Sequence, residues 1–140
     1  MKPSRVLGAA VCVATLWLPQ WAASQTVSSF TVVNADTGAD IATFASGGTV
    51  SIDSTPRINI RANASNVKSV VFTDGSTKRT ENTAPYAYKG NSGPVYAKWA
   101  PAAGTYVINV KPFAGSGGTG TAGAVAILTV VVNCTVDQAP

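Results

Sequence analysis

Short runs of β-branched and aromatic residues recur along this chain and constrain its fold more than any other feature. In INIRA, residues 58–62, three apolar residues alternate with Asn59 and Arg61, and TYVINV at 105–110 repeats this alternation. A period of two is expected for strands with one buried and one wet face. After the first two dozen residues, no window shows the longer period of an amphipathic helix.

We expect these runs to be the strands of one all-β domain, since clusters of Gly, Asn, Asp and Ser separate them every 8–12 residues or so, roughly as in β-sandwiches. The predicted strands are residues 28–34, 41–45, 49–53, 58–64, 68–74, 94–99, 105–113 and 124–132. The prediction is an immunoglobulin-like antiparallel β-sandwich of about seven or eight strands. TDGST at 73–77 predicts a tight hairpin. GSGGTGTAG at 115–123 is interpreted as a long loop between the last two strands.

The first 24 residues have the three-part layout of a cleavable signal peptide. Lys2 and Arg5 precede an apolar run, and small residues end it, so that cleavage after Ser24 is favoured. The apolar run is shorter than the roughly 20 residues of a membrane-spanning helix, and no span is expected after cleavage. A lipoprotein would be acylated at Cys12, but the preceding Val11 is larger than the usual small residue. We therefore expect a secreted or periplasmic protein.

The remaining chain is long enough for one domain with one core. We assign residues 25–133 to the sandwich and residues 134–140 to a tail. Eight basic and six acidic side chains remain after cleavage, too even a balance for the clustered basic stripe of a nucleic-acid-binding protein. Cys134 is then the only cysteine, which leaves a free thiol or a disulfide link between two copies of the chain.

Several segments resemble, in sequence and order, a class of bacterial secreted immunoglobulin-like modules. These modules are appended to carbohydrate-active enzymes and cell-surface proteins. The segments are FTVVNADTGADI (30–41), INIRANA (58–64), VKSVVF (67–72), RTENTAPYAYKG (79–90), WAPAAGTY (99–106) and KPFAGSGGTGTAG (111–123). The resemblance covers nearly all of the chain after the leader. It implies a sandwich fold and an accessory role, and it supplies no catalytic motif.

The stretch from Arg79 to Trp99 holds Tyr86, Tyr88, Tyr96 and Trp99, which is the only tryptophan that follows the leader. We expect Trp99 and Tyr86 to be core residues, because large rings supply much of the core of a small domain. The alternative is a partly exposed platform for a sugar ligand. In that hypothesis Tyr88 and Tyr96 stack on the sugar, and polar contacts come from Asn91, Lys89 and Arg79.

Two acidic residues, Asp36 and Asp40, are weak candidates for a metal site, since hard cations need several oxygen ligands. Their segment NADTGAD lacks the spacing of an EF-hand loop, and a turn held by its own Asn and Asp side chains is favoured. The sequence contains no histidine, which excludes a Ser-His-Asp triad and histidine-bound zinc. We expect no catalytic residues, no metal and no cofactor.

Two functions of different classes remain. The first is a non-catalytic binding module for a carbohydrate or a cell-surface polymer, which requires Tyr88 and Tyr96 to be exposed beside a groove. The second is a structural or assembly protein whose copies associate through exposed strand edges, such as residues 28–34 or 124–132. A disulfide-linked dimer through Cys134 would favour the second function.

Overall fold

The computed structural model describes residues 22–53 and 57–134, together with residues 3 and 8, and every regular element in this part is a strand. The predicted leader lies outside the described residues except for residues 3, 8 and 22–24, and the tail lies outside them except for Cys134. Among the described residues there is no helix of the length and apolarity that a bilayer crossing requires.

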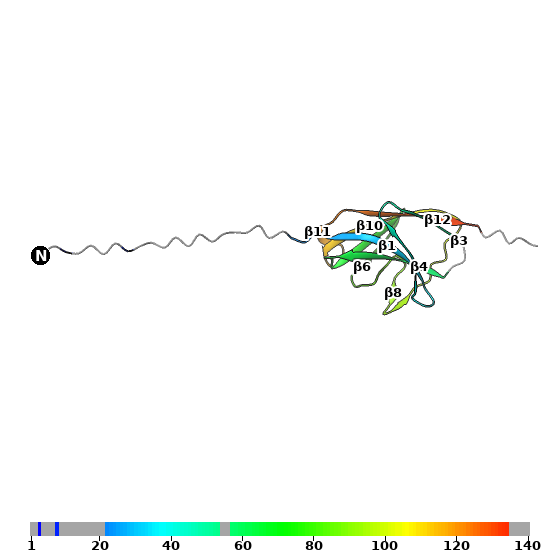
Figure 1. Ribbon diagram of the computed structural model, residues 1–140, viewed down its shortest axis with the longest axis horizontal. Helices are drawn as coiled ribbons and strands as arrows, with labels where there is room; N and C mark the ends of the chain where they lie inside the picture. The colour runs from blue at the N-terminus through cyan, green and yellow to red at the C-terminus, as the bar shows by residue number, and fades with distance from the viewer. Residues whose placement is uncertain (1–2, 4–7, 9–21, 54–56, 135–140) are drawn as a thin grey trace, which may run out of the picture.

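Two sheets form the body of the domain (Figure 1). The small sheet has the order β2-β1-β4-β7, with β1 (Thr26–Asn34), β2 (Asp40–Ala45), β4 (Ile58–Ser65) and β7 (Tyr86–Ala87). The large sheet has the order β3-β12-β10-β5-β6, with β3 (Thr49–Asp53), β5 (Ser69–Asp74), β6 (Thr77–Glu81), β10 (Gly104–Gly115) and β12 (Ala126–Asn133). A short strand, β11 (Thr119–Ala122), also pairs with β10. The hairpin of β8 (Asn91–Ser92) and β9 (Val95–Tyr96) projects at the bottom of Figure 1.

One apolar core lies between the two sheets. Its fully buried side chains include Phe30 and Ile60 from the small sheet and Phe72, Ile108 and Leu128 from the large sheet. They occupy alternate positions of their strands, as the period of two requires. The predicted all-β, immunoglobulin-like sandwich is therefore confirmed.

One strand pairing departs from the expected antiparallel arrangement. β3 runs parallel to β12, with Val50 beside Val130. The chain leaves β2 at the edge of the small sheet and crosses to the large sheet at Gly47 and Gly48, whose backbone groups bond Ile127 and Thr129 of β12. It therefore enters the large sheet in the same direction as β12.

The structure corrects the prediction in two other segments. Residues 94–99 are not one strand, because only Val95 and Tyr96 pair, as β9, and Trp99 forms an isolated bridge with Ile58. The glycine-rich segment is not a long loop, because β11 folds back on β10 after a turn at Gly117 and Gly118, both with positive φ. The TDGST hairpin is confirmed, with Asp74 opposite Thr77 across the β5–β6 turn.

The two strands expected to offer free edges are both internal. Residues 28–34 lie in β1, between β2 and β4, and residues 124–132 lead into β12, between β3 and β10. Their backbone groups are occupied on both sides, so association through these strands is ruled out by the topology. The edges of the two sheets are β2 and β7 in one, and β3 and β6 in the other.

Candidate functional site

Tyr88 does not form the exposed platform that the binding hypothesis required. Its side chain is 3% exposed and packs against Phe72 and edge-on to Trp99, with ring centroids 6.0 and 5.1 Å away. Its hydroxyl donates a 2.7 Å hydrogen bond to Asp74. β7 ends at Ala87, and the ring of the next residue, Tyr88, lies in the core between the two sheets. Burial there favours the apolar ring, and Asp74 satisfies the hydroxyl.

Tyr96 is also buried, at 7% exposure, but in a different place. It packs with Val33, Ala35 and Ala87 in a second small core. Its hydroxyl accepts a 3.3 Å hydrogen bond from Arg61. The β8–β9 hairpin thus covers part of the small sheet on the side away from the main core, so the expectation of an exposed Tyr96 is wrong.

The other predicted contact residues separate into two groups. Lys89 and Arg79 lie near Tyr88, whereas Asn91 belongs to the β8–β9 hairpin, opposite Tyr96, and donates to the carbonyl of Gly93. The five residues of the predicted site therefore do not surround one ligand. The expectation for Trp99 is confirmed at 5% exposure, and Tyr86 is only partly buried against the core.

Asn59 holds the segment that follows β7 onto the small sheet. Its side chain is fully buried, and its amide donates to the carbonyls of Gly90 and Ala97 at 3.0 and 2.7 Å. Its side-chain oxygen accepts from the backbone N–H groups of Lys89 and Ile60. All the hydrogen bonds that the amide normally makes are present, so Asn59 fixes the backbone around Lys89.

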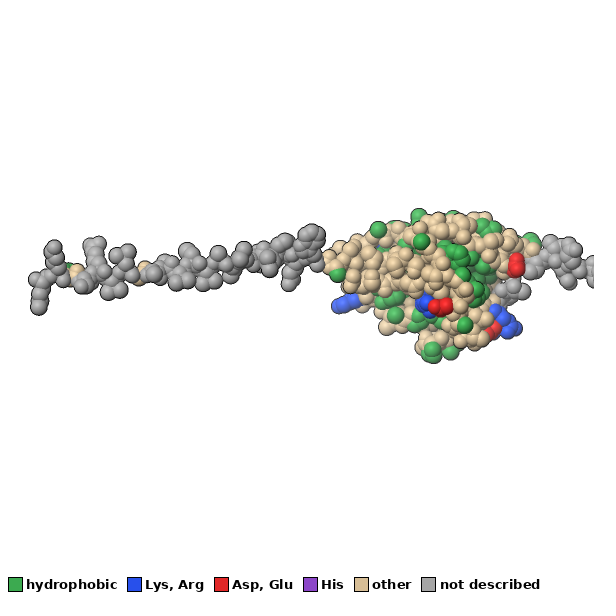
Figure 2. All heavy atoms as spheres, in the orientation of Figure 1, with side chains coloured by type: hydrophobic (Ala, Val, Ile, Leu, Met, Phe, Trp, Pro, Cys, Tyr) green, Lys and Arg blue, Asp and Glu red, His purple; other side chains and the backbone are tan. Residues whose placement is uncertain are grey.

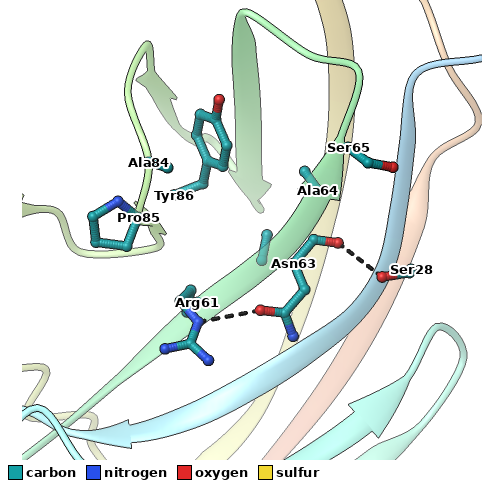
Figure 3. Close-up of a pocket in the computed structure, with 9 residues that line it drawn as sticks. Ser28, Arg61, Asn63, Ala64, Ser65, Ala84, Pro85 and Tyr86 are labelled. Carbon is teal, nitrogen blue, oxygen red and sulfur yellow. Dashed lines mark hydrogen bonds between the residues drawn. The ribbon is translucent and has the colours of Figure 1, made fainter. Parts of the chain in front are cut away.

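A groove beside β4 is the first of two hollows that these elements create (Figure 3). Its volume is about 520 Å³. We call it the β4 groove, and its lining residues are Ser28, Arg61, Ala62, Asn63, Ala64, Ser65, Ala84, Pro85 and Tyr86. Figure 3 shows Tyr86 and Pro85 on one side and the side chains of β4 on the other.

The β4 groove exists because β7 is too short to cover β4. Tyr86 pairs with Ala62, and the backbone N–H of Tyr88 donates to the backbone carbonyl of Ile60. By the alternation of backbone groups along a strand, Ala64 presents its N–H and C=O to the same side. In this antiparallel register Ala84 would lie opposite Ala64, but the pairing does not extend beyond Ala62 and Tyr86. The groove is thus the place of a missing strand residue.

Polar side chains on the β4 wall are fixed by bonds to one another. The Arg61 guanidinium makes two 2.9 Å bonds to Asp40 and one of 3.1 Å to the side-chain oxygen of Asn63. The side-chain amide of Asn63 donates to the hydroxyls of Ser29 and Thr31. The Ser28 hydroxyl donates to the backbone carbonyl of Asn63. These bonds fix the positions of Arg61 and Asn63 in the wall of the groove without a ligand.

Arg61, Asn63 and Ser28 are not among the site residues predicted from the sequence. A signal for two of them was present, because Asn59, Arg61 and Asn63 recur with a period of two and thus share one face of β4. That face was interpreted as merely wet. In the structure it carries the bonds that hold the later segment and the wall of the groove.

The second hollow is a cavity of about 200 Å³ beside β6. We call it the cationic cavity, and its lining residues are Phe72, Thr77, Lys78, Arg79, Tyr88 and Lys89. The Lys89 ammonium lies 4.1 Å from the centre of the Tyr88 ring, in a cation–π contact. Arg79 forms an ion pair with Glu81 and lies across Gly90, where a Cβ atom would stand 2.1 Å from the guanidinium.

Burial shifts the pKa values of two side chains in the wall of the cationic cavity, Lys89 and Tyr88. It lowers the pKa of Lys89, an effect that the charge of Asp74 opposes and that of Arg79 reinforces. Burial, together with the bond to Asp74, raises the pKa of Tyr88 above its ordinary value of 10.0. Lys89 remains a cation at neutral pH only at a cost in desolvation, which a bound anion would offset.

The weak metal candidates, Asp36 and Asp40, bind cationic side chains instead of converging on one point. Asp36 pairs with Arg57 and Lys98, at 3.0 and 2.7 Å, and these contacts lower its pKa, Lys98 most strongly. Asp40 pairs with Arg61. The predicted turn is confirmed, because Asn34 accepts bonds from the N–H groups of Asp36 and Thr37.

The surface adds two observations. On the face drawn in Figure 2, charged side chains form separate spots and no continuous basic stripe. Cys134 follows β12 directly and is exposed. Its position leaves the thiol accessible to a second chain, so the predicted disulfide link stays a prediction.

Comparisons with known proteins give little support for any function. No protein-family model matches the chain, and no curated protein matches its sequence. Among solved structures, the chain is similar to a fibronectin(III)-like module of Clostridium thermocellum CbhA, with a TM-score of 0.42 and 19% identity, over 62% of this chain and 87% of that chain. A likeness at this level assigns neither a family nor a ligand to the chain.

Proposed function

We propose that this protein is a secreted or periplasmic, non-catalytic binding module that holds a carbohydrate or another cell-surface polymer in the β4 groove. The observation that carries the proposal is the half-buried Tyr86 ring, which lines a groove of about 520 Å³ together with the fixed polar side chains of β4. Apolar walls with a few oriented polar groups are the usual composition of small-ligand sites.

The chemistry of the groove suits a sugar chain. The face of an aromatic ring can stack on the apolar face of a sugar, as Tyr86 is placed to do, while hydroxyl groups need oriented donors and acceptors. Ser28, Ser65 and Asn63 supply neutral ones, and Arg61 is held beside them. Because Arg61 already pairs with Asp40, the wall presents little uncompensated charge, which favours a neutral sugar.

The test is retention of the purified protein on immobilised cellulose, xylan, chitin and pectate, compared with Tyr86→Ala and Asn63→Ala variants. Tyr106→Ala is the matched control, since Tyr106 is also a partly buried ring packed on the core but lines neither hollow. We expect one polymer to retain the protein and the control, and loss of the Tyr86 ring to weaken binding about tenfold, since stacked rings contribute of order 1–3 kcal/mol in other polymer sites.

Two results would contradict the proposal. One is that no polymer retains the protein. The other is that folded Tyr86→Ala and Asn63→Ala proteins are retained as well as the control. Folding of each variant is checked by the dispersion of its amide proton spectrum, so that loss of binding is not confused with unfolding.

A second candidate is assembly through the edge strand β2, and it rests on a different observation. Residues 41–45 carry no charge, and Ile41 is 57% exposed. Edge strands are usually protected by charged residues, prolines or bulges. Here the protection is confined to the start of β2, at the charged Asp40 and at the irregularity between Val32 and Val33 in the pairing with β1. This edge replaces the internal strands first expected to associate.

Sedimentation over a range of concentrations, in reductant, tests this second candidate. Assembly through β2 predicts a dimer that Ile41→Lys dissociates, because a lysine ammonium would be placed against the partner strand. Cys134→Ser, measured without reductant, separates a disulfide-linked dimer from one held by strand pairing. A protein that is monomeric in both experiments contradicts assembly.

A further inference from the structure

We infer that the cationic cavity is a second binding site, which takes one oxyanion, a carboxylate or a sulfate group. This inference is independent of the β4 groove, because the two hollows share no lining residue. The volume of the cationic cavity, about 200 Å³, suits a single small group instead of a polymer chain.

The charges around the cavity have a positive excess. Lys78, Arg79 and Lys89 line it. The two carboxylates nearby are both engaged, because Asp74 accepts the hydroxyl of Tyr88 and Glu81 pairs with Arg79. Within the described part of the chain, no carboxylate forms an ion pair with Lys78 or Lys89. An oxyanion in the cavity would therefore meet two lysines, Lys78 and Lys89, that form no ion pair within the described part of the chain.

Two of the three cations, Lys89 and Arg79, are also held in position. Lys89 is fixed by the bond from its N–H to the buried Asn59 and by the contact of its ammonium with the Tyr88 ring. Arg79 lies across Gly90, the next residue, whose lack of a side chain permits this approach. A fixed guanidinium and a fixed ammonium can donate charge-assisted hydrogen bonds to one oxyanion without losing much side-chain entropy.

Lys111 provides an internal comparison. Its ammonium also lies over an aromatic ring, 5.6 Å from the centre of Phe113. Lys111 is exposed and lines neither hollow. Contact with a ring alone thus does not define the site, and Lys111→Gln is a matched control for the loss of one positive charge.

The experiment is a titration of the purified, isotope-labelled protein with sodium sulfate, sodium glucuronate and glucose, followed by amide NMR. Sodium chloride at matched ionic strength corrects for screening. We expect saturable shifts at Lys78, Lys89 and Gly90 with sulfate or glucuronate, and none with glucose. Lys89→Gln and Arg79→Gln should each weaken the binding about tenfold or more, since a charge-assisted bond contributes roughly 1.5–3 kcal/mol. Lys111→Gln should leave it unchanged.

The inference is overturned if neither sulfate nor glucuronate produces saturable shifts beyond those of chloride. It is also overturned if Lys89→Gln and Arg79→Gln bind as tightly as Lys111→Gln. Arg79 is exposed on an edge strand, so its variant is expected to fold even if the Lys89 variant does not. Failure of the β4 groove to bind a polymer would leave these shifts unaffected.

Discussion

The two hollows lie at the two ends of the same short strand, β7, but they arise in opposite ways. The β4 groove is left open because β7 begins only at Tyr86, opposite Ala62, and leaves Ala64 uncovered. Its walls are small, largely neutral side chains and one half-buried ring. The cationic cavity is closed by a fully packed ring, Tyr88, and by charges on the edge strand β6. Tyr88, which the sequence offers as a candidate for ligand stacking, is thus a buried core residue, whereas Tyr86, two residues earlier, lines the β4 groove.

The largest effect is expected at Asn59, which supports the cationic cavity and not the β4 groove. Asn59→Ala removes a buried amide that makes four hydrogen bonds. We expect it to lower the free energy of unfolding by roughly 5 kcal/mol or more, because four backbone groups lose their partners at about 1–3 kcal/mol each. Urea unfolding measures the loss. A decrease below about 1 kcal/mol would show that water or other groups replace these bonds.

The next prediction compares the two tyrosines on either side of Ala87. Tyr88→Ala removes a buried ring from between Phe72 and Trp99 and should cost about 3–5 kcal/mol of stability. Tyr86→Ala removes a partly buried ring and should cost about 1–2 kcal/mol. Thermal and urea unfolding of both variants provide the comparison. Equal losses would mean that Tyr86 is as much a core residue as Tyr88.

A smaller effect is expected at Gly90. This residue has a φ of +87°, and a Cβ atom would overlap the Arg79 guanidinium. Gly90→Ala should cost about 1–2 kcal/mol from the backbone conformation and should also displace Arg79 from the cationic cavity. Gly93→Ala is the control, since Gly93 has a φ of +57° with open space around it. Sulfate binding should weaken only in Gly90→Ala, and equal binding by both variants would contradict the assigned role of Arg79.

The smallest effect concerns pH. Burial and the bond to Asp74 raise the pKa of Tyr88 in the folded state above the value of 10.0 expected when the chain is unfolded. The neutral phenol is then favoured by folding, so its contribution to stability is complete below pH 10 and is lost as the pH rises above 10. The loss should be well under the limit of about 1.4 kcal/mol per pH unit.

Urea unfolding at about pH 9 and about pH 11 measures this effect, with reference to the ordinary phenol pKa of about 10. Tyr88→Phe is the control, because phenylalanine keeps most of the packing and cannot ionise. The stability of the parent should fall more than that of the variant between the two pH values. An equal fall in both proteins would show that Tyr88 does not titrate differently in the folded state.

The sequence could predict the sandwich, because its strands bury one face each and local alternation reports that directly. The core position of Trp99 followed from its size, because large rings supply much of the core of a small domain. The environment of Asn59 could not be predicted in this way, since its alternation with Ile58 and Ile60 indicated a wet face, and only the later segment around Gly90 and Ala97 buries it. Local patterns do not show which distant segment will cover a face.

The same limit explains the errors at the candidate site. The binding hypothesis requires Tyr88 and Tyr96 to be exposed, but the chain leaves the sheet after Ala87 and pairs again only briefly in β8 and β9. Alternation has no meaning outside a strand, so neither ring could be placed. The β4 groove depends on where β7 begins opposite β4. This is set by the pairing of two segments more than 20 residues apart in sequence.

The most direct test of the central claim is amide NMR of the parent protein during titration with cellohexaose, xylohexaose or chitohexaose, chosen according to the polymer that retains it. We predict saturable shifts at Ser28, Asn63, Ala64 and Tyr86, which line the β4 groove, and no shifts at Lys78 or Lys89. Shifts confined to the cationic cavity, or the absence of saturable shifts at Ala64 and Tyr86, would contradict the proposal that the β4 groove is the polymer-binding site.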